Sequence, residues 1–310
     1  MRVKSYVSAK ATVLSALVLF PLLVQAQTTV IGAGYTTPQP IDASPGQVIT
    51  IFARVAGKAV ADPVMASAPL PTSLGGFSIL LRQSFLDPML IPVLSVSDTQ
   101  SCSQVVPMQC ETVSQITVEI PYELMPNIPH VGLPQNFARL EIQYNDSQTS
   151  SLFLNPVPDS IHVLNSCDAA AGTSPTDDCR PMVTHADGSF VTADHPAHGG
   201  ETLTMALVGM GLPLAIVTTG AITPVAAPLD GVSISYDARV NASPSRGAPA
   251  SSSPVSTVQL RQGSVGIYEI AFAVPSLAAD VGTCSGAVRS NLTVNVSRIT
   301  SFAGVGICVE

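Results

Sequence analysis

The sequence has few residues that carry charge or stack on ligands. Charged residues make up 11% of the 310 positions and aromatic residues 5%, and tryptophan is absent. So low a charge content excludes a coiled coil and a highly charged disordered chain. The net charge of −8 also excludes the basic surface that nucleic-acid binding requires. We therefore expect no nucleic-acid partner.

The first 26 residues have the pattern of a secretory signal peptide. A basic start precedes an apolar run at 11–24, and residues 24–26 place small side chains at the two key positions of a cleavage site. The run contains Pro21 and is short for crossing a bilayer. We expect cleavage after Ala26 and no membrane span. An uncleaved membrane anchor is the alternative.

Loss of residues 1–26 would leave an acidic chain. It removes three basic residues and no acidic one, so the net charge becomes −11 and Lys58 becomes the single lysine. An acidic surface favours solubility and repels nucleic acid and anionic headgroups. We expect a mature protein that is secreted, periplasmic or held at the cell surface.

The cysteine content agrees with export. Six cysteines follow the leader: Cys102, Cys110, Cys167, Cys179, Cys284 and Cys308. An even number in an exported chain favours disulfide bonds. Pairing of sequential cysteines is the most local of the fifteen connectivities that six cysteines allow, and the sequence leaves the choice open. A zinc site is the alternative, but no C-x-x-C pair occurs and no cysteine has a histidine within four residues.

Apolar and polar residues alternate in many short segments. The clearest lie at 115–120, 139–144, 232–237 and 292–297. Because successive side chains of a strand point to opposite faces, each segment can bury one face and expose the other to water. Proline and glycine clusters separate the segments, as turns require. The pattern predicts an all-β protein.

The two halves of the chain follow the same order of signals. A glycine turn enters a strand, a Leu-x-Gly phrase enters a second, and proline stops a third. These signals fall at 44–51, 74–79 and 115–121, and again at 198–205, 229–234 and 268–275. Such repetition predicts two tandem copies of one β-sandwich domain. We place them at 27–165 and 166–310, after the signal peptide at 1–26.

Five phrases in this order carry a family resemblance. They lie at 44–48, 73–77, 115–121, 185–189 and 266–275. Together they resemble a C-terminal module of secreted bacterial proteins that occurs in large paralogous sets of acidobacterial type. The resemblance covers roughly residues 29–310. It implies tandem immunoglobulin-like folds of IPT/TIG type, an uncharacterised function and no catalytic residues to carry over.

Motifs for common chemistries are absent from the sequence. It has no G-x-S-x-G elbow, no P-loop and no H-E-x-x-H. Its densest polar group consists of His185, Asp187, Asp194, His195 and His198, which are weak candidates for binding a divalent cation. The segment fits a turn, a short strand and a turn better, because Asp-Gly favours hairpins. We expect no catalytic residue and no cofactor.

These features favour a secreted, non-enzymatic binding, adhesion or scaffold module whose partner is an unknown extracellular protein or glycan. One alternative is an extracellular hydrolase or a carbohydrate-binding accessory protein. For sugar binding, the candidate stacking residues are Tyr122, Tyr144, Tyr236 and Tyr268. Another alternative is a cell-envelope component that pairs through an exposed strand edge.

Overall fold

The chain is built almost entirely of strands. The computed structural model describes residues 28–35, 40–104, 108–127, 136–171, 179–237, 251–276, 284, 291–296 and 302–310. The expected leader at 1–26 lies outside this part. Across these ranges the one helical element is a single 3-10 turn, η1 (Ala169–Ala171). The predicted all-β fold is confirmed. None of the described segments forms a helix long and apolar enough to cross a membrane.

The first sandwich consists of two sheets built from residues 28–156. One sheet has the order β1 (Thr28–Ala33), β3 (Val48–Val55), β9 (Cys110–Glu119), β8 (Val93–Cys102) and β4 (Val64–Met65). The other has the order β2 (Ile41–Ala43), β11 (Ser147–Pro156), β10 (Ala138–Tyr144), β6 (Phe77–Gln83) and β5 (Ser73–Leu74), with β7 (Leu86–Leu90) paired to β6. The pairings are antiparallel except that of β2 with β11.

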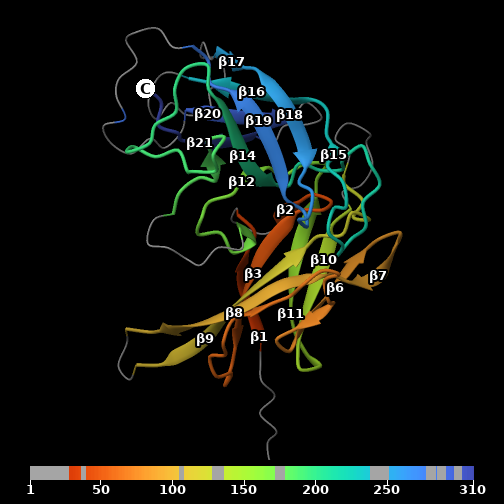
Figure 1. Ribbon diagram of the computed structural model, residues 1–310. Coiled ribbons are helices and arrows are strands. Elements are labelled where there is room, and N and C mark those ends of the chain that lie inside the picture. Colours follow the sequence, from red (N-terminus) through yellow and green to blue (C-terminus); the bar gives the residue numbers. More distant parts are fainter. Residues whose placement is uncertain are drawn as a thin grey trace, which may run out of the picture.

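The second sandwich also has two sheets. One has the order β12 (His162–Val163), β14 (Thr202–Val208), β19 (Tyr268–Ala273), β18 (Val255–Leu260) and β15 (Ala227–Pro228), with β13 (Val183–Thr184) paired to β14. The other has the order β17 (Ser251–Ser253), β16 (Val232–Tyr236), β20 (Leu292–Val296) and β21 (Phe302–Val305). In Figure 1 the first sandwich lies below and the second above. The boundary expected at 165/166 stays a prediction. Strand β12 lies before that position in the chain, yet it pairs with β14 in the second sandwich.

The matched signals of the two halves occupy equivalent places. In the first sandwich β3 pairs with β9, while β6 lies in the opposite sheet. In the second sandwich β14 pairs with β19, while β16 lies in the opposite sheet. The repeated order of sequence signals therefore corresponds to a repeated arrangement of strands.

Alternation places the predicted apolar faces inside the sandwiches, but some polar residues of the alternating strands are buried as well. Ile116 and Val118 of β9 are fully buried in the first core. The polar residues that alternate with them were expected to face water, yet Thr117 and Glu119 are also buried. The expectation fails for Glu119 because the 212–225 connection of the second sandwich covers it, and its carboxylate accepts a hydrogen bond from Gly220 N.

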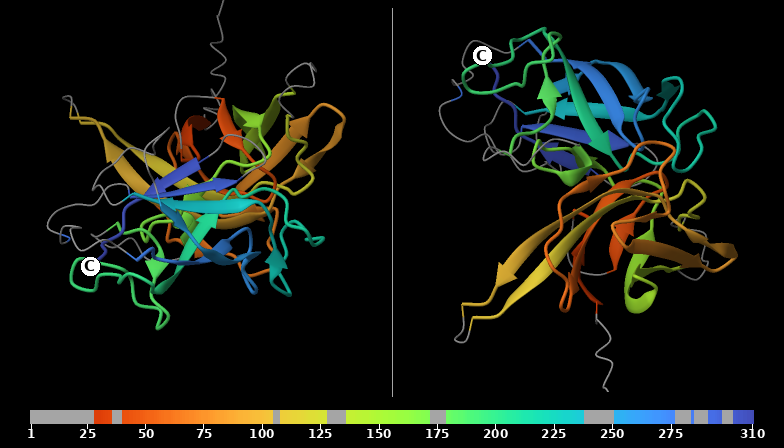
Figure 2. Two further views of the ribbon diagram at one scale, coloured as in Figure 1. Left: turned by 90° about the horizontal axis from the view of Figure 1, so that it is seen from above. Right: turned by 60° about the horizontal axis from the view of Figure 1, so that its bottom comes forward.

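A third apolar cluster joins the two sandwiches. Val48 of β3 packs there with Leu164, Ala170, Ala206 and Val208 from the second half of the chain. All five residues are buried. Figure 2 shows the two sandwiches in contact, with the long β8–β9 hairpin extending away from both. Burial of apolar side chains from both halves stabilises one relative placement of the sandwiches.

Three disulfide bonds connect sequential cysteines. The Cys102–Cys110 bond joins register partners at the ends of β8 and β9. The other bonds are Cys167–Cys179, beside the contact between the sandwiches, and Cys284–Cys308 near the C-terminus. The prediction of disulfide bonds is confirmed. They close short loops, which constrains the unfolded chain more than it adds contacts to the folded one.

Two glycines of one turn provide a test of the contact between the two sandwiches. Both have positive φ, +75° at Gly263 and +65° at Gly266, but only Gly266 faces the first sandwich. A Cβ at Gly266 would lie 2.6 Å from Gly46 O and 2.7 Å from Val48 Cγ2, whereas one at Gly263 would meet nothing within 4 Å. We expect Gly263→Ala to cost about 1–2 kcal/mol through its φ alone. Gly266→Ala should cost about 1–3 kcal/mol more, because it also overpacks the contact.

Urea denaturation of both variants and the wild type measures the difference. Equal losses of stability in the two variants would contradict a close contact between the sandwiches at Gly266.

Candidate functional site

The first candidate is the polar group that follows β13. His185 is buried, its Nδ1 donates to Glu201 Oε1 at 2.5 Å, and its Nε2 donates to the His195 carbonyl at 3.2 Å. Burial lowers the pKa of His185, but these two hydrogen bonds and the Glu201 charge outweigh it, so the pKa lies above its ordinary value. Both ring nitrogens act as donors and offer no lone pair to a metal ion.

The structure brings some of the five metal candidates together and separates others. The rings of His185 and His195 lie in tilted contact, with centroids 4.2 Å apart and an angle of 31° between their planes. Asp187 accepts from Ser189, and His198 Nδ1 lies 3.2 Å from the Glu310 carbonyl. Asp194 is exposed to solvent. In the part of the chain that the structure describes, no group of three or more His, Cys, Asp or Glu is arranged as a metal site.

Glu201 is the partner that sequence analysis missed. Its Oε1 binds His185 and its Oε2 accepts from His198 N at 3.0 Å. Burial raises its pKa, but the hydrogen bonds from His185 and His198 outweigh this effect and lower it. The available signal was the spacing of three residues between His198 and Glu201 across two glycines, which is typical of a turn that a carboxylate closes.

Ser189, Asp187 and His195 lie together but in the wrong order for a nucleophile. The Ser189 hydroxyl donates to Asp187 Oδ1 at 2.6 Å and lies 3.1 Å from His195 Nδ1. A serine nucleophile must give its proton to the imidazole, and a carboxylate must hold the far side of that ring. Here the hydroxyl donates its hydrogen bond to the carboxylate instead, and the carboxylate does not hold the imidazole. The arrangement is that of a closed turn.

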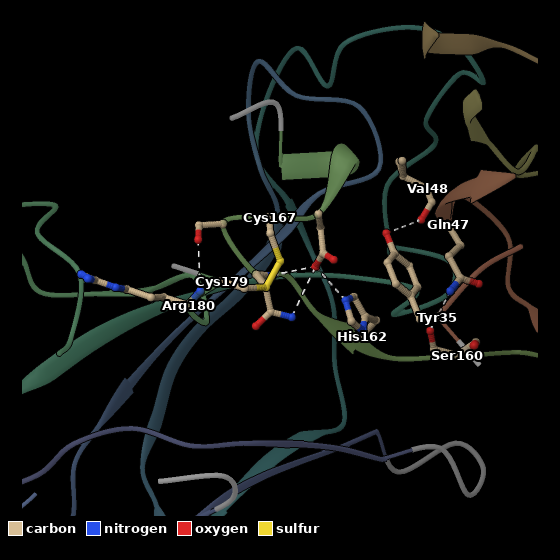
Figure 3. A network of polar contacts seen from close by, with 11 residues as sticks. Tyr35, Gln47, Val48, Ser160, His162, Cys167, Cys179 and Arg180 are labelled. Atoms are coloured by element: carbon tan, nitrogen blue, oxygen red, sulfur yellow. Dashed lines mark hydrogen bonds and ion pairs between the residues drawn. A yellow bond between two sulfur atoms is a disulfide. The ribbon is translucent and has the colours of Figure 1, made fainter. Parts of the chain in front are cut away.

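The second candidate is the polar network where the two sandwiches meet (Figure 3). The Tyr35 ring stacks on His162 at a centroid distance of 3.6 Å, and Tyr35 Oη donates to Val48 O at 3.2 Å. His162 Nε2 lies 2.9 Å from Asp168 Oδ2, which also accepts from Asn165 N at 2.6 Å. Burial raises the pKa of Asp168, but the hydrogen bonds from His162 and Asn165 outweigh it, so the pKa is lowered.

A second contact in the same view crosses the junction. Gln47 Nε2 donates to Ser160 O at 3.0 Å, while Gln47 Oε1 accepts from Ser44 N at 2.9 Å. Gln47 is buried, so both ends of its amide need these partners. The polar groups in this region bond to one another across the junction, which is what a structural role requires.

Glu119 is the most unusual ionisable group of the junction. It is fully buried at the end of β9, and its Oε2 accepts from Gly220 N at 2.6 Å. Its Oε1 has no hydrogen-bond partner within the described residues. Burial raises the pKa of Glu119, the Gly220 hydrogen bond lowers it and the charge of Glu123 raises it, and together they bring the pKa to about 8. The junction therefore favours a protonated Glu119 at neutral pH.

The same region anchors the 212–225 connection between β14 and β15. Thr219 Oγ1 accepts from Tyr122 N at 3.0 Å and donates to Glu123 Oε2 at 2.7 Å. Gly220 O accepts from Leu70 N at 2.7 Å. The middle of the connection is thus bonded to the first sandwich, although both of its ends belong to the second.

The third candidate is the outward side of this connection, which we call the apolar segment (212–225). Five of its large apolar residues are exposed: Leu212, Leu214, Ile216, Ile222 and Val225. Ile216 is fully exposed, and Val225 is 70% exposed. The segment contains no charged and no aromatic residue. Exposed apolar residues gathered in one place are typical of a contact surface for a partner.

The tyrosines considered for sugar stacking do not form a platform. Tyr236 and Tyr268 are buried in the core of the second sandwich. Tyr122 packs partly buried against the same core, and Tyr144 packs against the core of the first sandwich. The alternation that predicted strands placed these rings on inner faces. Stacking on a sugar requires exposed rings, so the tyrosines give no support to glycan binding.

Comparisons with known proteins add no family. No family model matches the chain, and no curated protein matches it. Similar solved structures include a chain named BspA_C_WT, with 10% identity over 92% of this chain and 98% of that chain, and a TM-score of 0.20. Another is the wild-type C-terminal domain of the AgI/II polypeptide BspA of Streptococcus agalactiae, with the same identity and coverage and a TM-score of 0.22. TM-scores this low do not establish a shared fold. The resemblance to an acidobacterial-type module stays a prediction.

The raised pKa of Glu119 predicts a specific dependence of stability on pH. The folded-state pKa of about 8 lies above the ordinary value of 4.5, so the folded state binds the proton more tightly than the unfolded state does. This stabilisation is complete below about pH 4.5 and is lost as the pH rises through about 8. The Glu119→Gln variant lacks the titration. We expect it to match the wild type near pH 4 and to exceed its free energy of unfolding by about 3–5 kcal/mol near pH 9.

Urea denaturation at both pH values measures the effect. The matched control is Glu111→Gln. The Glu111 side chain is 46% exposed and its ion pair with Arg54 lies in solvent, so the pair contributes little to stability and this variant should run parallel to the wild type across the range. If Glu119→Gln also runs parallel to the wild type, Glu119 is not the buried group that the junction implies.

Proposed function

We propose that this protein is an extracellular, non-enzymatic binding protein that holds a protein partner at its apolar segment (212–225). The observation that carries the proposal is the exposure of five large apolar side chains within 14 residues of one connection. Leaving these side chains in water costs free energy that a partner would recover by covering them.

The chemistry of the apolar segment favours a protein over other partners. It has no charged residue to attract an ionic ligand and no aromatic ring to stack on a sugar. Leucine, isoleucine and valine side chains gain from contact with other apolar side chains. Isolated apolar residues on a surface are common, whereas five exposed ones within a single connection are more than a soluble surface normally carries.

Anchoring of the apolar segment supports binding. Thr219 and Gly220 bond to the first sandwich, and Thr223 N donates to Ser264 O in the second at 2.9 Å. A segment held in this way loses little conformational entropy when it binds, so more of the contact energy appears as affinity. Both sandwiches thus serve to present one surface.

An extracellular location is supported by the three disulfide bonds, because such bonds persist in oxidising compartments. The signal-peptide pattern at 1–26 points the same way. A hydrolase function finds no support at Ser189, whose hydroxyl donates to Asp187. Pairing of a partner with an exposed strand edge is a weaker proposal, because none of the described edge strands exposes as many large apolar side chains as the apolar segment does.

A charge introduced into the apolar segment should abolish binding. We expect Ile216→Asp to weaken the binding of a protein partner at least about tenfold, because a desolvated carboxylate opposes an apolar contact. The mature protein, labelled with a fluorophore, is applied to an array of purified extracellular proteins and to a glycan array. The wild type should bind saturably to members of the protein array.

The matched control is Met108→Asp, which introduces the same charge at a residue that is 71% exposed on the β8–β9 hairpin. It should bind as the wild type does. Equal binding by Ile216→Asp and the wild type, binding confined to glycans, or no binding to either array would each contradict the proposal.

A further inference from the structure

The end of the first sandwich that lies away from the junction holds a lysine and an aspartate in direct contact. Lys58 follows β3, and Asp98 lies on β8, with β9 between these two strands in the sheet. Lys58 Nζ contacts Asp98 Oδ2, and the two side chains are only 5% and 1% exposed. Lys58 is also the one lysine after the predicted leader. The pair therefore belongs to the interior and not to the charged surface of the protein.

The surroundings of this pair are apolar on one side. Lys58 Nζ lies 5.8 Å from the ring centroids of both Phe77 and Tyr144, which come from β6 and β10 of the opposite sheet. Phe77 is fully buried. Desolvation of two opposite charges in such a place costs about as much as their attraction returns. A neutral group formed from these two side chains would avoid the cost of desolvating two charges.

Two donors hold the carboxyl group of Asp98. Ser114 Oγ on β9 donates to Oδ1 at 2.5 Å, and Ala61 N donates to Oδ2 at 3.2 Å. Thr112 Oγ1, also on β9, donates to the carbonyl of Lys58 and fixes the backbone from which the lysine side chain extends. Donors on both carboxyl oxygens stabilise the negative charge that develops there when a nucleophile attacks the carbon.

We propose that Lys58 and Asp98 condense to form an intramolecular amide (isopeptide) bond. A proton passes from the Lys58 ammonium to the Asp98 carboxylate, which leaves a neutral amine beside a carboxylic acid. The Nζ lone pair then forms a bond to Cγ, the bond from Cγ to the hydroxyl oxygen breaks, and one water molecule leaves with a second proton from the nitrogen. The reaction needs no oxidant, reductant or cofactor.

The closeness of the Lys58 amine and the Asp98 carboxyl group favours the reaction. The fold holds amine and carboxyl in contact, so the reaction loses none of the translational freedom that a bimolecular condensation loses. The product is uncharged, which suits the apolar side formed by Phe77 and Tyr144. Such a bond would fix the end of β3 to β8 across β9, and unlike the three disulfide bonds it would persist under reduction. This inference does not depend on the contact surface proposed above.

The mass of the intact chain tests the proposal. The mature protein, with its cysteines reduced and alkylated, should be lighter by one water molecule than its sequence requires. Trypsin cleaves after lysine and arginine, and the arginines nearest the pair are Arg54, Arg82 and Arg139. Digestion should therefore yield one species in which the peptides 55–82 and 83–139 are joined, with no cleavage after Lys58.

The matched variant is Lys58→Arg, which keeps the positive charge next to Asp98 but cannot form the bond under these conditions. Lys58→Arg should have the full mass that its sequence requires and give separate peptides. Ser114→Ala, which removes the donor to Oδ1, should show a larger unbonded fraction than the wild type.

Three results would overturn the proposal. A wild-type chain of full mass would show that the pair is an ion pair only. Loss of one water molecule in Lys58→Arg as well would place the dehydration elsewhere in the chain. Cleavage after Lys58 in the folded wild type, with separate peptides, would show that the amine is free. The wild-type measurement decides the question even if a variant fails to fold.

Discussion

The contact between the two sandwiches is the feature on which the rest of the structure depends. Each sandwich has its own core, but the outer face of β9 and the start of β3 are covered by the other half of the chain. Val48, Gln47 and Glu119 are buried only because the second sandwich lies against them. The contact combines an apolar cluster with hydrogen bonds that satisfy most of the polar groups at its edge.

This contact also determines the conformation of the apolar segment (212–225). A connection of this length between two strands would otherwise sample many conformations. Its hydrogen bonds to Tyr122 and Glu119 hold Thr219 and Gly220 against the first sandwich, so the apolar side chains on either side point outward from a fixed backbone. The proposed binding surface is therefore a product of both sandwiches. It would not survive in an isolated second half.

Local pattern predicted most of the fold. Strict alternation at 115–120 and 292–297 indicated strands, and β9 and β20 occupy these places. The ordered repeat of glycine and proline signals indicated two similar halves, and the strands β3, β9, β14 and β19 pair equivalently. These signals succeed because they arise from neighbours in the chain. The pleat of a strand and the φ of a turn are local properties.

The functional features depended on contacts that no local pattern records. Glu119 looked like the exposed residue of an alternating strand, and its burial arises from Gly220, 101 positions later. Lys58 and Asp98 are 40 positions apart, and nothing near either residue indicates the other. The His185 group was noticed because its members lie close in sequence, yet the fold adds Glu201 and leaves Asp194 in solvent. Density of polar residues along the chain is thus a poor guide to density in space.

The two sandwiches form one packed unit at the Glu119 junction, and amide hydrogen exchange of the mature protein can show whether they do, because Gly220 N and Tyr122 N donate across the junction. These two amides should exchange about as slowly as those inside β9, since they open only when the junction opens. Exchange at the rate of a solvent-exposed loop, with β9 still protected, would show instead that the sandwiches separate freely.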